Sequence, residues 1–187
     1  MADKDALAGR GTMATQDNEE AREAVLAMAR RVALLHMSYA RTLVDALGEE
    51  QGKELICKAI WAYGTRIGER TRARVEALGH APTPEAYGLG SDLSPLAFPT
   101  ERVVVEGEAR SRARSCVLAE VWREYGEEEV GSLYCLVDPA KMQAYNPAWT
   151  MVHTQKIPDG DPCCDIATRP TKASDEPGSP LASTARL

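Results

Sequence analysis

The first half of the chain carries two long stretches whose apolar residues recur at alternating steps of three and four. In the first stretch these residues are Val25, Met28, Val32, Leu35, Tyr39, Leu43 and Leu47. The spacing places them on one face of an amphipathic helix, which we expect to begin after Asp17 and to end at Gly48. A second helix of the same kind runs from Glu49 to Gly79, where two prolines follow. The short link between the two stretches predicts an antiparallel helical hairpin.

The second half of the chain changes to shorter elements, several of them with a period of two. A connection rich in Pro, Gly and Ser covers residues 79–100. Beyond it, the alternation predicts strands over residues 103–105, 110–114, 150–157 and 163–167. Residues 116–125 have the spacing of a short helix, whereas residues 133–138 fit a helix or a strand. Asp159 and Gly160 form a turn signal between the last two strands, which favours an antiparallel pairing.

Together these elements predict an α+β fold, in which an N-terminal antiparallel helical hairpin is followed by a small antiparallel sheet with short helices. The 187 residues are enough for one such domain, which we place at residues 17–167. Its hairpin covers residues 17–79, and its sheet and site region cover residues 101–167. Residues 1–16 are polar and aperiodic and predict a disordered arm, and residues 168–187, rich in Pro, Ser and Thr, predict a disordered tail.

Composition and charge narrow the class of protein. The net charge of −6 and the pI near 5.2 argue against a nucleic-acid partner, which usually requires a basic surface. No apolar run approaches the length of a membrane span, and no secretory signal is visible at the start, so we expect no membrane partner. Five cysteines, an odd number without an export signal, indicate reduced thiols and a cytoplasmic location.

Reactive side chains are concentrated between residues 134 and 164. Cys135 precedes Asp138 by three positions, so the thiol and the carboxylate share one face if this segment is helical. Asp161 follows a glycine at a turn, and Cys164 lies three positions beyond it. A thiolate beside a carboxylate also needs a positive neighbour, because the carboxylate alone raises the thiol pKa. We therefore expect Cys135, Asp138, Asp161 and Cys164 to be the catalytic residues.

A second group of residues is suited to holding a small carboxylate substrate. Its members are Tyr145, Asn146, His153, Lys156 and Arg112. His153 is the best general-base candidate of the three histidines, and Lys156 or Arg112 supplies a cation for the carboxylate. Each residue also has an ordinary structural role open to it. Cysteines pack in cores, Asp161 and Asn146 bond to their own turns, and Arg112 lies on a solvated strand face.

Zinc is an alternative to a metal-free site. Cys116, Cys135 and Cys164 would supply three ligands, with Asp138, Asp161 or His153 as the fourth. The chain has no Cys-x-x-Cys pair and no His-Glu-x-x-His motif, and the long separations between these residues make the zinc signal weak. A Gly-x-Ser-x-Gly elbow and the glycine-rich phosphate loops are absent as well, which disfavours serine hydrolases and nucleotide-binding enzymes.

The order of these motifs resembles the L-2-amino-thiazoline-4-carboxylic acid hydrolase family between Cys116 and Ala167. The resemblance rests on Cys116, Gly126, Tyr134-Cys135-x-x-Asp138, Tyr145-Asn146-Pro147, Lys156 and Gly160-Asp161-x-x-Cys164. It implies a hydrolase acting on C–N bonds of a cyclic amidine, which opens the ring of L-2-amino-thiazoline-4-carboxylate to N-carbamoyl-L-cysteine in L-cysteine formation. Cys163 is an extra thiol next to the motif, so the sequence leaves open which of the two cysteines faces the site.

The resemblance implies a small-molecule carboxylate substrate and no cofactor, and the helical hairpin offers a surface for a homo-oligomer. The nucleophile stays open between the Cys135 thiolate and an activated water. A competing class is a sensor module that binds a small ligand or zinc, similar to the ligand-binding domains named after vinyl reductase. Stoichiometric zinc in the purified protein would favour that class.

Overall fold

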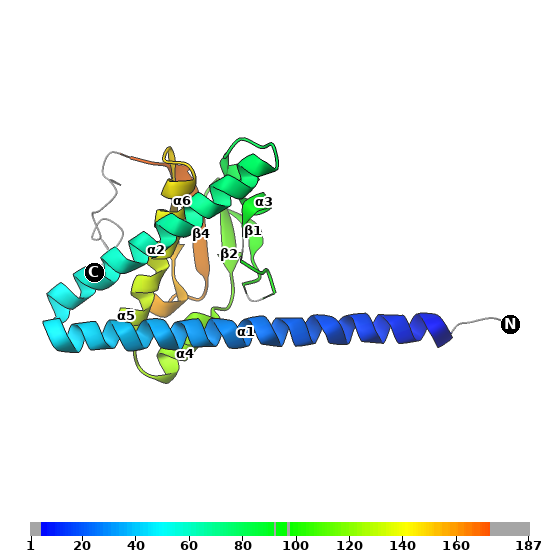
Figure 1. Cartoon of the computed structure of the whole chain (residues 1–187), viewed down its shortest axis with the longest axis horizontal. Helices are drawn as coiled ribbons and strands as arrows, with labels where there is room; N and C mark the ends of the chain where they lie inside the picture. Colours follow the sequence, from blue (N-terminus) through cyan, green and yellow to red (C-terminus); the bar gives the residue numbers. More distant parts are fainter. Residues whose placement is uncertain (1–4, 92, 97, 173–187) are drawn as a thin grey trace.

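The computed structural model describes residues 5–91, 93–96 and 98–172 of the chain. Two long helices, α1 (Asp5–Leu47) and α2 (Glu49–Ala77), diverge from the turn at Gly48, and the N-terminal part of α1 extends past the rest of the molecule (Figure 1). This confirms the predicted hairpin. The start of α1 is a correction, because residues 5–16 are helical although an arm was predicted for residues 1–16. The helix propensity of the alanines and other good helix formers in residues 5–16 outweighs the unfavourable propensity of two glycines. Residues 1–4 lie outside the described residues.

The remaining helices are short and the strands are few. The connection after α2 contains η1 (Pro84–Ala86) and α3 (Tyr87–Gly90). The elements that follow are β1 (Glu101–Val105), β2 (Glu108–Ala113), α4 (Val117–Glu124), α5 (Glu128–Gly131), η2 (Ser132–Leu136), α6 (Val137–Tyr145), β3 (Trp149–Gln155), η3 (Ile157–Asp159) and β4 (Cys164–Pro170). The undecided segment at residues 133–138 is therefore helical, and the other predicted elements of the second half are confirmed.

The four strands form one antiparallel sheet in the order β1-β2-β4-β3. Two hairpins, β1–β2 and β3–β4, lie side by side and join where Ala113 of β2 pairs with Cys164 of β4. Strand β4 continues to Pro170, so the tail predicted for residues 168–187 starts too early. Thr168 and Arg169 pair with β3. The sequence did not indicate this pairing, because these two residues stand directly before Pro170 and Thr171 at the start of the segment rich in Pro, Ser and Thr. Residues 173–187 lie outside the described residues.

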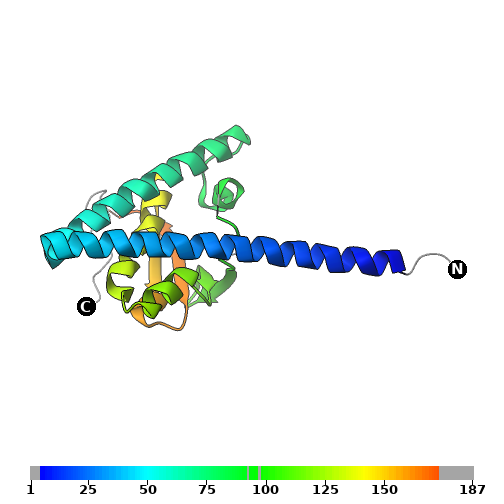
Figure 2. The same cartoon turned by 60° about the horizontal axis from the view of Figure 1, so that its bottom comes forward.

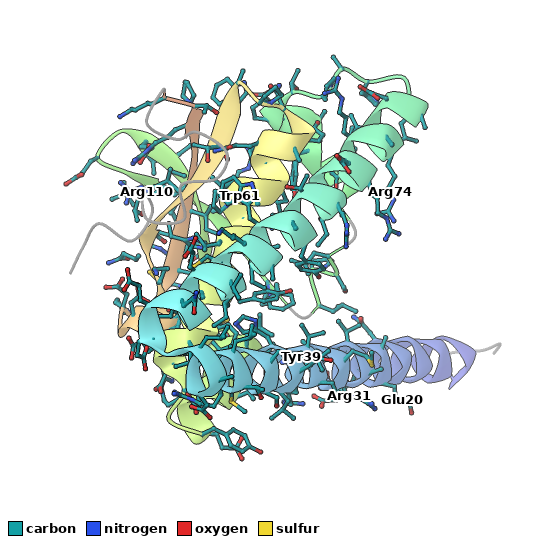
Figure 3. The ribbon with its side chains drawn as sticks, turned by 60° about the vertical axis from the view of Figure 1, so that its left-hand side comes forward. Glu20, Arg31, Tyr39, Trp61, Arg74 and Arg110 are labelled. Atoms are coloured by element: carbon teal, nitrogen blue, oxygen red, sulfur yellow. The ribbon has the colours of Figure 1, made fainter. Side chains whose placement is uncertain are left out.

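The helices lie on one face of this sheet (Figures 1 and 2). Alternate residues of β3 contact α6: Trp149 and Met151 pack against it, and His153 bonds to its first turn. On the opposite face, Arg110, Arg112 and Asp165 form a network of ion pairs. Figure 3 shows Arg110 on the side of the sheet away from α6 and α2. Groups on the two faces therefore cannot meet in one site.

Close packing against α2 sets the position of α6. A Cβ atom on Gly64 would lie 2.7 Å from the Ala140 side chain, and one on Gly68 would lie 2.1 Å from the backbone oxygen of Lys141. Neither contact is sterically possible, so the two glycines allow the helices to approach at this point. The first turn of α6, which carries Asp138, is fixed against the sheet as a result.

The buried apolar residues form separate clusters along the helical hairpin. Trp122 of α4 is fully buried, donates from Nε1 to the Ala33 carbonyl at 3.2 Å, and holds α4 against α1. His36 packs tilted against the Trp122 ring and edge-on to the Tyr134 ring. Burial lowers the pKa of His36, although its contacts with the backbone of Val130 and Gly131 act in the opposite direction. No described helix has the length and apolarity that crossing a membrane requires.

Candidate active site

The candidate site lies where the start of α6 meets β3 and β4. Cys135 is in η2 and Asp138 is in the first turn of α6, so the predicted pairing of thiol and carboxylate on one helical face is present. Because η2 runs directly into α6, both groups point to the helix-covered face of the sheet. His153 of β3 and Cys164 of β4 occupy that same face, which brings four of the predicted residues together.

Asp138 is the centre of the polar contacts. Its Oδ1 contacts Nζ of Lys141 one turn further along α6, and its Oδ2 lies 3.1 Å from Nε2 of His153. The side chain of Asp138 is 15% exposed and that of His153 is 8% exposed. Each carboxylate oxygen thus has its own partner, and the carboxylate and the imidazole are both largely shielded from water.

The charge state of Asp138 follows from these contacts. Burial alone would raise the pKa of Asp138, because a carboxylate is poorly solvated inside the protein. The charge of Lys141 and the hydrogen bond from His153 outweigh burial, and the pKa is held well below its ordinary value. Asp138 is therefore an anion at neutral pH, and Nε2 of His153 must carry a proton to donate to it. In the neutral tautomer that makes this contact, the lone pair lies on Nδ1.

Three thiols surround the carboxylate and all three are protonated at neutral pH. Burial raises the pKa of Cys135 well above its usual range, Asp138 raises it further, and Lys156 offsets only part of the effect. Burial also raises the pKa of Cys164 to about 11, although its Sγ accepts a hydrogen bond from the Ile157 amide at 3.3 Å. Cys116, directly before α4, has a raised pKa for the same reason, opposed by the Ala119 and Leu118 amides.

Lys156 and Asp161 belong to the connection between β3 and β4. Nζ of Lys156 lies 2.6 Å from Asp159, and its charge still reaches Cys135. Asp161 accepts a hydrogen bond from the Lys156 amide at 2.8 Å, and Gly160 before it has a φ of 95°, which favours glycine. The Asp161 carboxylate is thus engaged in holding the turn, so it positions Lys156 through the backbone.

Tyr145 and Asn146 lie at the far end of α6, away from Asp138. The Tyr145 hydroxyl donates to the Thr83 carbonyl at 2.9 Å, and Asn146 Nδ2 donates to the Pro82 carbonyl at 2.8 Å. Asn146 Oδ1 also accepts from the Ala148 amide. These contacts fasten the connection after α2 to the end of α6. The structure does not bring either residue to the thiols, because Asp138 is in the first turn of the nine-residue helix α6 and Tyr145 is its last residue.

Arg112 lies on the other face of the sheet from Asp138. It binds Asp165 through two hydrogen bonds of 2.7 and 2.6 Å, and Asp165 is almost completely buried. The bond from Arg112 raises the guanidinium pKa and lowers that of Asp165. Arg112 is therefore a partner of a buried carboxylate in the sheet, and the structure does not bring it to the thiols with the other predicted site residues.

Lys141 is the residue of this site that sequence reasoning missed. The signal was present, since Lys141 follows Asp138 at a spacing of three and α6 places both on one face. It was overlooked because the segment beyond Asp138 had no assigned structure. Cys116 was predicted as a possible zinc ligand and as part of the family motif but not as a catalytic residue, although its charge interactions with Cys135 and Asp138 place it near the same carboxylate.

The predicted zinc set is not assembled. Within residues 5–91, 93–96 and 98–172, no three His, Cys, Asp or Glu side chains gather closely enough to hold a metal ion. Asp138 gives its two oxygens to His153 and Lys141, which leaves the three thiols without a shared acidic partner. The arrangement instead suits proton transfer, because a buried carboxylate orients an imidazole whose other nitrogen can take a proton.

An α+β fold with a buried carboxylate–histidine pair and neutral thiols defines a small protein whose interior is equipped for acid–base chemistry. The model of one family, described as L-2-amino-thiazoline-4-carboxylic acid hydrolase, matches residues 26–167. The chain belongs to this family, whose activity is hydrolysis at the C–N bond of L-2-amino-thiazoline-4-carboxylic acid. No curated protein and no solved structure matches the chain.

Proposed function

We propose that His153, oriented by Asp138, is the general base that opens the ring of L-2-amino-thiazoline-4-carboxylate in this protein. The observation that carries the proposal is the 3.1 Å contact between His153 Nε2 and a carboxylate that is buried and ionised. A base held this way keeps one tautomer and needs no reorganisation when it accepts a proton. The substrate in this proposal is that of the family, and the Asp138–His153 pair provides the proton transfer that hydrolysis of this substrate requires.

The reaction begins at the amidine carbon, which is bonded to the ring sulfur and to two nitrogens. Nδ1 of His153 takes one proton from water while the oxygen adds across the C–N double bond, and the second proton of that water passes from the oxygen to the ring nitrogen. The tetrahedral carbon then expels the sulfur, which receives the proton held by His153. Both nitrogens stay on the carbon, so the product is N-carbamoyl-L-cysteine with a free thiol. Cleavage of the bond between the amidine carbon and the ring nitrogen would instead give S-carbamoyl-L-cysteine, which has no free thiol.

Water is the nucleophile that the thiol pKa values favour. Burial and Asp138 keep Cys135 protonated, and a neutral thiol is a poor nucleophile. Cys135 and Cys164 then line the apolar side of the substrate. Lys156 is the more exposed cation, at 22% against 16% for Lys141, and supplies a charge for the substrate carboxylate at the edge of the site.

A ring-opening assay followed by mass spectrometry tests the proposal. The substrate should gain one water, and the product should react with a thiol reagent after the protein has been removed. His153→Gln should lower kcat by about 100-fold or more, and Asp138→Asn should do the same. His80→Gln is the matched control, because His80 is an exposed histidine after the end of α2. Unchanged kcat in both site variants would overturn the assignment of the dyad.

Cys135→Ala separates the two nucleophiles. If water attacks, turnover falls by no more than about 10-fold, the size expected for a lost contact. If Cys135 attacks, turnover disappears and wild-type protein mixed rapidly with substrate shows a covalent adduct on Cys135. The second result would replace water by the thiol as nucleophile and would leave His153 as its base.

We infer further that the protein works in the cytoplasm on a small carboxylate and without a nucleic-acid partner, in agreement with its reduced thiols and net charge of −6.

We also propose a homodimer through α1. Apart from Leu47 at the C-terminal end of α1, the exposed large apolar residues described on this helix are Met28, Val32, Leu35 and Tyr39. Their steps of four, three and four read the same in both directions, so an antiparallel second copy places Met28 against Tyr39 and Val32 against Leu35.

A further inference from the structure

We infer that Lys141 is a positioning residue for the reaction, holding Asp138 so that only one carboxylate oxygen is presented to His153. This inference rests on the proposed role of the Asp138–His153 pair. Lys141 occupies Oδ1 and His153 occupies Oδ2, so rotation of the carboxylate would break both contacts together. The Lys141 side chain is 16% exposed, which makes the contact part of the interior of the site.

The backbone of Lys141 is itself held by α2. The carbonyl of Lys141 lies so close to Gly68 that a Cβ atom there would be 2.1 Å away. Lys141 is therefore fixed at its backbone by one helix and at its ammonium group by the carboxylate one turn earlier. A side chain tied at both ends loses little further freedom when it binds Asp138, so the geometry of the carboxylate is maintained before substrate arrives.

The charges around Asp138 show why a cation is needed at this position. The groups that interact electrostatically with it are Lys141 on α6, His153 on β3, Tyr134 and Cys135 in η2, Cys116 before α4 and Cys164 on β4. Among these six, Lys141 alone is a permanent cation. Without it, the buried carboxylate would be balanced only by protonating His153, and a protonated imidazole is no base.

Titration of the three histidine rings by NMR in wild-type protein, Lys141→Met and Lys141→Arg tests this inference without requiring turnover. Removing the cation should move the midpoint of the His153 ring titration upward by about one pH unit, and arginine should restore it. Lys58→Met, which removes an exposed cation paired with Glu54, is the control and should leave the midpoint in place. An unmoved midpoint in Lys141→Met would overturn the inference. If that variant does not fold, Lys141→Gln, which keeps a hydrogen-bond donor, replaces it.

The pH profile of kcat/KM provides the second measurement. In Lys141→Met the pH below which activity falls should rise by about one unit, since His153 must be neutral to act as base. A residue that only stabilised the fold would lower the active fraction without moving this limb. If wild-type protein opens no ring and the NMR midpoint still moves, the proposed function fails while the role of Lys141 toward Asp138 stands.

Discussion

Cys163 and Cys164 are neighbours in sequence and direct their thiols to opposite faces of the sheet. Cys164 Sγ accepts from the Ile157 amide on the helix-covered face, whereas Cys163 donates to Gln155 at 3.0 Å and contacts Asp165 on the other face. Cys163 lies directly before β4 and Cys164 is its first residue, so the two side chains alternate as successive residues of an extended chain do. This alternation settles which thiol accompanies Asp138, and it assigns Cys163 to the ion-pair network.

Replacing each of the two cysteines by alanine should therefore affect activity and stability differently. Cys164→Ala removes a thiol beside the site and should lower kcat/KM by about 10-fold, together with a loss of stability. Cys163→Ala should leave kcat/KM within about two-fold and lower the free energy of unfolding by about 1 kcal/mol, because it removes one hydrogen bond. Steady-state kinetics and urea unfolding on both variants provide the comparison. Equal losses of activity would contradict the separation of faces.

The sequence predicted the parts of this fold that depend on local periodicity. Both long helices and the four strands follow from spacing of apolar residues and from turn residues such as Gly160. The sequence could not predict the strand order, because the pairing of β2 with β4 joins segments separated by more than fifty residues. The N-terminal start of α1 was missed because Gly9 and Gly11 weaken the periodic pattern without ending the helix.

The candidate site was predicted in part for the same reason. Cys135 and Asp138 are neighbours on one helical turn, so their proximity was visible, and His153 and Cys164 joined them through the register of the β3–β4 hairpin. The sequence could not place Arg112 relative to the other residues, because the face of the sheet on which it lies, covered or uncovered, depends on which side the helices pack. Tertiary packing determines which face of the sheet the helices cover, and a run of alternating arginines does not indicate that face.

Arg112 should prove to be a structural residue. Arg112→Ala leaves the carboxylate of Asp165, 1% exposed, with a weaker partner in Arg110 at 4.0 Å, and an unpaired buried charge is strongly destabilising. We expect a fall in Tm on the order of 10 °C, with kcat per folded molecule unchanged. Arg114→Ala is the control, because Arg114 pairs with Glu101 at an exposed position. A large rise in KM at unchanged Tm would instead support the substrate-binding role.

Glu108 should make the protein sensitive to acid. Hydrogen bonds from Arg169, aided by Arg110, lower the pKa of Glu108 to about 2. A carboxyl group whose pKa is lower in the folded state stabilises the fold above its unfolded pKa, near 4.5, and loses this contribution as the pH falls toward 2. Urea unfolding should therefore show a steeper loss of stability below pH 4.5 in wild-type protein than in Glu108→Gln. Glu124→Gln, at an exposed position, should retain the wild-type slope, and parallel curves for Glu108→Gln would contradict the assignment.

The exposed stripe on α1 should determine the oligomeric state. Tyr39 is 67% exposed and Leu35 is 59% exposed, and such residues in a seam of matched spacing are stabilised when a second copy covers them. We expect a dimer by light scattering after size-exclusion chromatography at tens of micromolar. Leu35→Glu should convert it to a monomer by placing two like charges in the seam near the two-fold axis. Ala27→Glu adds the same charge outside the stripe and should stay dimeric. A wild-type monomer at these concentrations would contradict the proposed dimer, and a Leu35→Glu variant that remains dimeric would place the contact elsewhere.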